Sequence, residues 1–473
     1  MPNGPAPEPD QEPLSSVDYA WLRMDEPANL MVINGVLVLE EGLEPEALRR
    51  VLEERLLAIP RFRWRVVRRS RGRPVWQEDP DFDLDRHMVV ERVSPPGDQA
   101  ALRDAISDRL GAPLDPDHPP WCFHLLQGLD DGASVLMGRL HHCLGDGIAL
   151  MLVLLSLTEL EEGGQPGGTG PTETGENPFR MLFGGGKPDM DRVRRLAEHF
   201  MPEGMRLMLH PADALQRANR WLKGVAMTGS LGRLALRKPD PKTVLKGKLK
   251  PGKRAAWSGA VPLEQVKEIQ GALGGTVNDV LLTAVAGGLR RYLEGRGQEV
   301  RRRLAFRAAV PVNLRPLHLM DRLGNHFGLV FLSLPVGIVE PTARLAEVRR
   351  RMRALRSSAE PLVTFRILKI LGLSPHILQR AVVQLLAAKT TVVMTNVPGP
   401  RETLYLGGKP IREIFFWVPQ AGRVGMGLSI CSYAGQVRLG VGTDAGLVPD
   451  PEGVVEGFEE EIEALRRLAR AAG

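Results

Sequence analysis

The chain has 473 residues, of which 43% are hydrophobic and 25% are charged, with a formal net charge of +6 and three cysteines. This composition excludes disordered and fibrous proteins, and the length predicts two domains because single cores rarely grow to this size. The cysteines lie far apart and form no C-x-x-C pair, which argues against a disulfide framework and indicates a reducing compartment. We therefore expect a cytoplasmic protein.

The N-terminus, residues 1–13, is rich in proline and acidic residues and lacks the basic segment and apolar run of a signal peptide. We expect it to be disordered. The longest apolar stretch, Ile148–Leu157, is shorter than the about 20 residues that a membrane-spanning helix needs. The sequence therefore predicts no segment that crosses a bilayer.

Residues 14–160 predict an N-terminal α/β domain, because strand-like and helix-like apolar patterns alternate along them. After a short helical stretch from Leu14, the expected elements are a strand over Leu30–Leu39, a helix over Glu44–Ala58, paired strands over Phe62–Val67 and Arg73–Gln77, a helix over Ala100–Gly111, a strand over Ala133–Leu140 and a helix over Ile148–Leu157.

The turn between the last strand and the last helix of this domain carries the sequence His141–Gly147, with Asp146 four residues after His142. A neutral imidazole can take a proton from a hydroxyl and return it to a leaving group within one turnover, because its pKa lies close to the working pH. The pattern therefore indicates a general base at a strand end.

Other interpretations of these residues stay open. Asp146 can be only the N-cap of the following helix, and His141 can be a core histidine. A metal site on His142 and Asp146 is disfavoured, because Gly145 and Gly147 indicate a turn and no third ligand has a suitable spacing. Cys143 beside an imidazole is a possible nucleophile in principle, but an extended strand would point its side chain inward.

Residues 161–253 predict a linker followed by a basic helical crossover. Residues 161–187 are rich in Gly, Pro, Thr and Glu, and the segment between 190 and 235 is basic and rich in methionine. Lysine and arginine are concentrated between Arg192 and Arg254 without the aromatic array of a nucleic-acid module. Anionic lipid or a small phosphate-bearing molecule fits this segment better than nucleic acid.

The order of elements restarts in residues 254–473, which predict a second α/β domain. The expected elements are a strand over Trp257–Val261, helices over Leu263–Leu273 and Thr276–Leu293, strands over Leu304–Val312 and His326–Val336, two apolar helices within Phe365–Leu386 broken at Pro375, strands over Thr391–Val397, Arg412–Val418, Gly427–Tyr433 and Gln436–Gly442, and a closing helix over Pro451–Ala472.

Seven segments spread over nearly the whole chain carry a recognisable pattern. They are Leu14–Asp18 (LSSVD), Pro119–Trp121 (PPW), His141–Gly147 (HHCLGDG), Thr276–Val280 (TVNDV), Pro311–Arg315 (PVNLR), Gly324–Gly328 (GNHFG) and Asn396–Pro400 (NVPGP). With these segments the sequence resembles the bacterial wax ester synthase/acyl-CoA:diacylglycerol acyltransferase family. The family commonly has Pro-Leu-Trp at the second segment and a small residue where Cys143 stands.

The resemblance implies two chloramphenicol-acetyltransferase-like domains, with the active site in a channel between them. It implies that His142 is the catalytic base, that His141, Asp146 and Gly147 shape the site, and that Asp146 pairs with an arginine of the other half, for which Arg315 is our choice.

A side-chain amide near the reacting carbonyl would stabilise the oxyanion. Asn278, with Asp279 in support, is our candidate for this role, and helix capping by these two residues is the equal alternative. The apolar helices near Phe365–Leu386 and Ile148–Leu157 are candidates to line an acyl pocket, although ordinary core packing explains them as well.

The resemblance further implies an O-acyltransferase that moves a long-chain fatty acyl group from acyl-CoA to diacylglycerol or a fatty alcohol. Acyl-CoA would be a co-substrate, with no bound cofactor or metal, and the protein would contact the inner membrane or lipid inclusions peripherally. Two alternatives remain: an enzyme that takes acyl groups from a carrier protein, and a catalytically inactive lipid-binding protein. No carrier sequence with its Gly-Ser attachment site is present in the chain.

Overall fold

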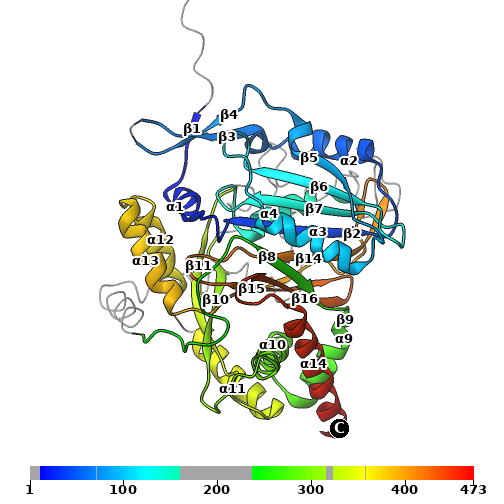
Figure 1. Ribbon diagram of the computed structural model, residues 1–473, viewed down its shortest axis with the longest axis vertical. Helices are drawn as coiled ribbons and strands as arrows, with labels where there is room; N and C mark the ends of the chain where they lie inside the picture. The colour runs from blue at the N-terminus through cyan, green and yellow to red at the C-terminus, as the bar shows by residue number, and fades with distance from the viewer. Residues whose placement is uncertain are drawn as a thin grey trace, which may run out of the picture.

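The computed structural model describes residues 11–70, 72–159, 237–315, 323–356, 358 and 360–472. Within these residues the chain forms two mixed α/β halves, as predicted, each built around one large sheet. In Figure 1 the sheet of the N-terminal half lies above the sheet of the C-terminal half, and both chain halves contribute to the region where they meet.

The sheet of the N-terminal half has six strands among the described residues. In spatial order they are β13 (Tyr405–Leu406), β14 (Lys409–Trp417), β2 (Val32–Leu39), β7 (Val135–His141), β6 (Trp121–Gln127) and β5 (Met88–Arg92). All neighbours are antiparallel except β5 and β6. The helices of this half are α1 (Ser16–Met24), α2 (Pro45–Val51) with a π-helical turn over Leu52–Leu56, α3 (Gln99–Gly111) and α4 (Gly147–Ser156).

A smaller sheet lies beside it and consists of β1 (Gln11–Pro13), β4 (Val75–Glu78) and β3 (Trp64–Val67). The pairing of β3 with β4 confirms the predicted strand pair around residue 70. The expected disorder is wrong for Gln11–Pro13, which form β1 and pair with Val75–Gln77 of β4, and residues 1–10 lie outside the described residues.

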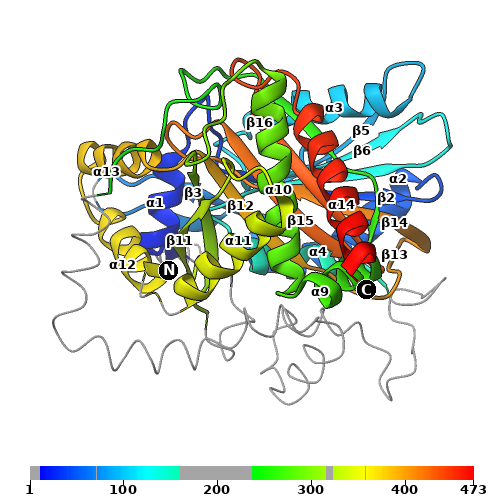
Figure 2. The same ribbon diagram turned by 90° about the horizontal axis from the view of Figure 1, so that it is seen from below.

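The sheet of the C-terminal half has seven strands among the described residues. They are β11 (Phe327–Leu334), β10 (Phe306–Asn313), β12 (Val392–Pro398), β15 (Met426–Tyr433), β16 (Gln436–Asp444) and β8 (Lys253–Trp257), with β9 (Val261–Pro262) also paired to β16. The helices of this half are α9 (Leu263–Leu273), α10 (Val277–Gly295), α11 (Pro341–Arg356), α12 (Glu360–Leu371), α13 (His376–Ala388) and α14 (Glu452–Ala472). Figure 2 shows α10, α11 and α14 side by side over one face of this sheet.

The strands of the two sheets are not separated along the chain at residue 254, where the second domain was predicted to begin. Strand β14 leaves the C-terminal half and pairs with β2, so that Trp417 lies opposite Asn34. Each half has its own apolar core, and a further apolar cluster lies between the halves. In this cluster the ring of Trp257 stacks on the ring of Phe415. The halves therefore share a strand and a core, which fixes how they meet.

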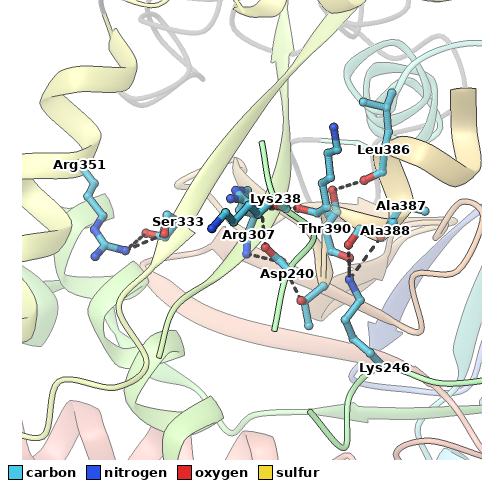
Figure 3. Close-up of polar contacts among 12 residues, drawn as sticks. Lys238, Asp240, Lys246, Arg307, Ser333, Arg351, Leu386, Ala387, Ala388 and Thr390 are labelled. Carbon is cyan, nitrogen blue, oxygen red and sulfur yellow. Dashed lines mark hydrogen bonds and ion pairs between the residues drawn. The ribbon is translucent and has the colours of Figure 1, made fainter. Parts of the chain in front are cut away.

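The end of the predicted crossover, residues 237–253, is fastened to the C-terminal half. The carboxylate of Asp240 accepts hydrogen bonds from the backbone N–H of Arg307 and the hydroxyl of Thr391 (Figure 3). The Lys246 ammonium donates to the carbonyl oxygens of Ala388 and Thr390, each at 2.9 Å, at the C-terminal end of α13. The linker and the rest of the crossover, including residues 160–236, lie outside the described residues.

None of the single helices described is both long and apolar enough to cross a membrane, whereas the pair α9 and α10 satisfies the length and composition test together, with a 97° bend between them.

Candidate active site

His142 lies immediately after β7, at the junction of the two halves. Strand β7 ends at His141, and α4 begins at Gly147 with Asp146 as its N-cap. The backbone N–H of His142 donates to the carbonyl oxygen of Met31 at 2.7 Å. The predicted strand, turn and helix are therefore present, and the turn holds the backbone of His142 against the segment that leads into β2.

The imidazole of His142 is enclosed by aromatic rings. It stacks on the indole of Trp21 with ring centroids 4.2 Å apart and planes inclined by 12°, and it lies 5.4 Å from the ring of Phe327. The residue is 7% exposed. Burial lowers the pKa of His142 to about 4, although its own carbonyl group and the Asp146 carboxylate favour the charged form. The ring is therefore neutral at physiological pH.

The two ring nitrogens of His142 differ in what they can do. Nδ1 is buried and has no hydrogen-bond partner in another described residue. The backbone carbonyl oxygen of His142 favours a proton on the imidazole ring. A proton on Nδ1 leaves the lone pair of the neutral ring on Nε2. With the proton on Nδ1, Nε2 would be the nitrogen that accepts a proton from a substrate.

Asp146 does not face the substrate, because its carboxylate binds the other half of the protein. Oδ2 of Asp146 forms a 2.8 Å ion pair with Arg315 and accepts the backbone N–H of His326 at 3.0 Å, and Oδ1 caps α4 by accepting the N–H of Ala149. Burial alone would raise the pKa of this carboxyl, but Arg315 and the two N–H donors hold it below its ordinary value. The expected pair of Asp146 with Arg315 is present, and so is the capping role.

A second buried connection runs from α1 through Asn325 to His142. Nδ2 of Asn325 donates to Oδ1 of Asp18 and to the backbone carbonyl oxygen of His142, each at 2.7 Å. Gly324 pairs with Gly145, and at a φ of +112° it occupies a backbone region that favours glycine. No role was predicted for Asp18, Trp21 or Asn325, although Asp18 belongs to the LSSVD segment and Asn325 to the GNHFG segment.

His141 and Cys143 turn away from this site. The backbone N–H of Cys143 donates to Nδ1 of His141, and Nε2 lies 3.7 Å from Oδ1 of Asp25. Both residues are buried, and Cys143 belongs to the core of the N-terminal half. Its side chain points inward as the strand pattern predicted, which leaves no thiol beside the His142 ring.

Asn278 and Asp279 at the start of α10 have different roles. The carboxylate of Asp279 accepts the N–H and the hydroxyl of Thr276 in a capping box, so the capping interpretation holds for Asp279. An ionised carboxylate cannot donate to an oxyanion. Oδ1 of Asn278 accepts a hydrogen bond from Nδ2 of Asn396 at 2.8 Å. The amino group of the Asn278 side chain therefore points away from Asn396 and can donate a hydrogen bond to another group.

Gly147 is exposed at the first helical position of α4, and a Cβ atom added there would meet nothing within 4 Å. The described residues thus give no packing reason for glycine at this position. Over the same residues, no group of three or more His, Cys, Asp or Glu side chains is arranged to hold a metal ion.

The low pKa of His142 predicts how kcat/KM depends on pH. A base must be unprotonated to act, so kcat/KM is expected to stay constant between about pH 5 and 8 and to fall at lower pH as the ring takes up a proton. The measurement is kcat/KM against pH, with the folded fraction followed by circular dichroism at each pH. A titration centred near the ordinary histidine pKa of about 6.5 would contradict the buried, neutral imidazole.

Two family models match this chain. Residues 14–281 match the wax ester synthase/diacylglycerol acyltransferase catalytic domain, and residues 323–466 match the WS/DGAT C-terminal domain. The chain is 26% identical over 469 residues to a probable diacylglycerol O-acyltransferase of Mycobacterium tuberculosis, covering 97% of this chain and 96% of that protein.

Two solved structures share the fold. The wax ester synthase/diacylglycerol acyltransferase of Marinobacter aquaeolei VT8 superposes with a TM-score of 0.68 at 21% identity, covering 97% of this chain and 99% of that one. The first condensation domain of the calcium-dependent antibiotic synthetase superposes with a TM-score of 0.60 at 15% identity, covering 97% of this chain and 96% of that domain.

Proposed function

The chain belongs to the wax ester synthase/diacylglycerol acyltransferase family of acyl-CoA-dependent O-acyltransferases, and from this we propose that His142 drives direct transfer of a long-chain acyl group to the hydroxyl of diacylglycerol or a fatty alcohol. One observation carries the proposal: His142 is a neutral base at the junction of the halves, with only Nε2 open to a substrate, while Asp146 is held by Arg315.

In the proposed reaction Nε2 of His142 removes the proton of the acceptor hydroxyl. The oxygen attacks the thioester carbonyl carbon and forms a tetrahedral oxyanion, which collapses with breakage of the carbon–sulfur bond. The leaving CoA thiolate takes the proton back from His142, so the products are an ester and free CoA. The protein forms no covalent bond to the acyl group, and acyl-CoA acts as a co-substrate.

The other site residues position this base. Trp21 and Phe327 hold the plane of the imidazole, and the hydrogen bond from Asn325 holds its backbone carbonyl. The Asp146–Arg315 pair joins the His142 turn to the C-terminal half, so the base keeps its place relative to groups supplied by that half. The open space beside Gly147 leaves room for a substrate near the turn.

Asn278 is our candidate for the oxyanion donor, because Asn396 orients its amide and the capping box of α10 does not require its side chain. Replacing Asn278 with alanine is expected to lower kcat by about 10²–10³-fold, as for the loss of one oxyanion-hole donor. The matched control is Thr276→Ser, which keeps the cap. If the Asn278 variant retains kcat within a few fold of the natural chain, Asn278 is not the donor.

Long-chain substrates partition into membranes, so we propose peripheral contact of the protein with a lipid surface, with the basic segment as one candidate. The described part of that segment is divided. Lys246 and Lys253 donate hydrogen bonds inside the protein, whereas Lys238, Lys242, Lys248 and Lys250 are exposed. These four exposed lysines are therefore available for contact with a lipid surface.

Neutralising the lysine and arginine residues between Arg192 and Arg254 is expected to weaken binding to anionic vesicles, since each cation near a charged surface contributes about 1 kcal/mol. The measurement is co-sedimentation with vesicles at low and high salt. Unchanged binding after neutralisation would exclude this segment as the lipid contact.

A further inference from the structure

Exposed large hydrophobic side chains are concentrated in the hairpin of α12 and α13. Seven such side chains are exposed among the described residues, and five of them lie between Ile370 and Leu385. These five, which we call the hairpin patch, are Ile370 (62% exposed), Leu373 (68%), Ile377 (83%), Leu378 (51%) and Leu385 (48%). A concentration of apolar side chains on one surface marks an interaction site more often than scattered ones do.

The hairpin patch belongs to an ordered element whose other face is packed. Leu368 of α12 lies in an apolar cluster with Trp21 and Phe327, and Leu386 of α13 packs beside Phe331. Arg23 donates to the carbonyl oxygens of Leu371 and Ser374 where α12 ends. The inner face of the hairpin is thus anchored, while its connecting turn at Pro375 carries the most exposed apolar residues. Figures 1 and 2 show the hairpin at the edge of the molecule beside α1.

The charged side chains within the hairpin sequence have one sign. Residues 361–390 contain four lysine or arginine residues and no aspartate or glutamate. Lys369 is exposed on α12. Arg380 is exposed on α13, where its guanidinium lies 3.5 Å from the carboxylate of Glu26, just after α1. Apolar side chains next to cations are complementary to a surface with acyl chains below and negative headgroups above.

The hairpin also reaches the active site. The ring of Phe365 on α12 lies 6.2 Å from the ring of His326, and the backbone N–H of His326 binds Asp146. Eight residues of α12 and the following turn separate Phe365 from Leu373, which is about 12 Å at the helical rise. A lipid surface touching the hairpin patch would therefore lie close to the His142 site.

We propose that the turn of the α12–α13 hairpin inserts into the surface of an anionic phospholipid membrane, and that this docking supplies the membrane-dissolved acceptor to the His142 site. The inference rests on the proposed function for the acceptor, but the docking itself is measurable without turnover.

The test compares the double variant Ile377→Asp/Leu378→Asp with Val339→Asp in the full chain. Val339 is a matched control, since it is 66% exposed and precedes α11, outside the hairpin. Affinity for vesicles of phosphatidylcholine and phosphatidylglycerol in equal amounts is measured by co-sedimentation. The hairpin variant is expected to bind at least about tenfold more weakly, because two inserted side chains are replaced by charges, whereas the control binds like the natural chain.

Turnover of a short, water-soluble acyl-CoA and a short alcohol separates this proposal from the proposed function. The hairpin variant is expected to keep this soluble activity and to lose activity toward diacylglycerol in vesicles. If the natural chain does not turn over the water-soluble substrates, the proposed function is contradicted, while the vesicle-binding measurement of docking stays valid. Docking is overturned if the hairpin variant binds vesicles as well as the control, or if light scattering shows that the natural chain is a dimer and the hairpin variant a monomer.

Discussion

Replacing His142 with alanine is expected to lower kcat for acyl transfer by about 10²–10⁴-fold, the typical contribution of a positioned general base. The ring is neutral at physiological pH because burial lowers its pKa to about 4, and its Nδ1 is buried, so Nε2 alone can serve the substrate. No other described imidazole occupies this place, since His141 faces Cys143 and Asp25. The measurement is the steady-state rate of ester formation from palmitoyl-CoA.

A control separates lost chemistry from lost packing. His124 is also buried, on β6, where its Nδ1 lies 2.7 Å from the Glu91 carboxylate. His124→Ala should lower the thermal unfolding temperature yet leave kcat within a few fold of the natural chain. If His142→Ala and His124→Ala reduce kcat equally, His142 has no special chemical role.

Replacing Arg315 with methionine is expected to lower the free energy of unfolding by about 3–5 kcal/mol, the cost of leaving one member of a buried ion pair without its partner. Arg315 and Asp146 are both almost completely buried, and the 2.8 Å contact joins the start of α4 to the end of β10 across the two halves. Because the His142 turn is anchored through Asp146, the variant should also lose activity. Urea unfolding followed by tryptophan fluorescence measures the change in stability.

The matched second variant is Asp146→Asn combined with Arg315→Met. Asparagine keeps the cap of α4 and removes the unpaired charge, so the double variant is expected to be more stable than Arg315→Met alone. The buried pair would not hold the halves together if Arg315→Met changed the unfolding free energy by less than about 1 kcal/mol.

The sequence predicted the parts of the site that depend on local structure. The strand, turn and helix around His141–Gly147 follow from apolar patterns on both sides of the turn, and they are present. The pairing of Asp146 with Arg315 came from the family resemblance. Trp21 and Asn325 had no assigned role, because they reach His142 only through tertiary packing of α1 and of the segment before β11.

Most elements with a local periodicity were predicted, but helix α11 (Pro341–Arg356) was missed. The strand predicted over Trp257–Val261 is wrong, because β8 ends at Trp257 and β9 begins at Val261. Strands β5 and β6 were not expected, since β6 is buried along most of its length and shows no alternation. The strand near Arg412–Val418 was expected and is present, but its place beside β2 in the other half could not be read from its own residues.

The apolar helices within Phe365–Leu386 show a related limit. Their break at Pro375 was predicted and occurs between α12 and α13. Both faces of the hairpin are apolar, so the sequence alone did not distinguish its packed face from the exposed hairpin patch. Packing of the inner face against β10, β11 and α1 is a tertiary property.

The most direct test of direct transfer by His142 is the release of CoA thiol from palmitoyl-CoA by the purified chain, with and without a long-chain alcohol or diacylglycerol. We predict release that requires an acceptor, shows no initial burst and disappears in His142→Ala, and the better acceptor identifies the physiological product class. A burst of thiol without acceptor, together with acylated protein in the mass spectrum, would contradict direct transfer, and no release with either acceptor would contradict the enzymatic function itself.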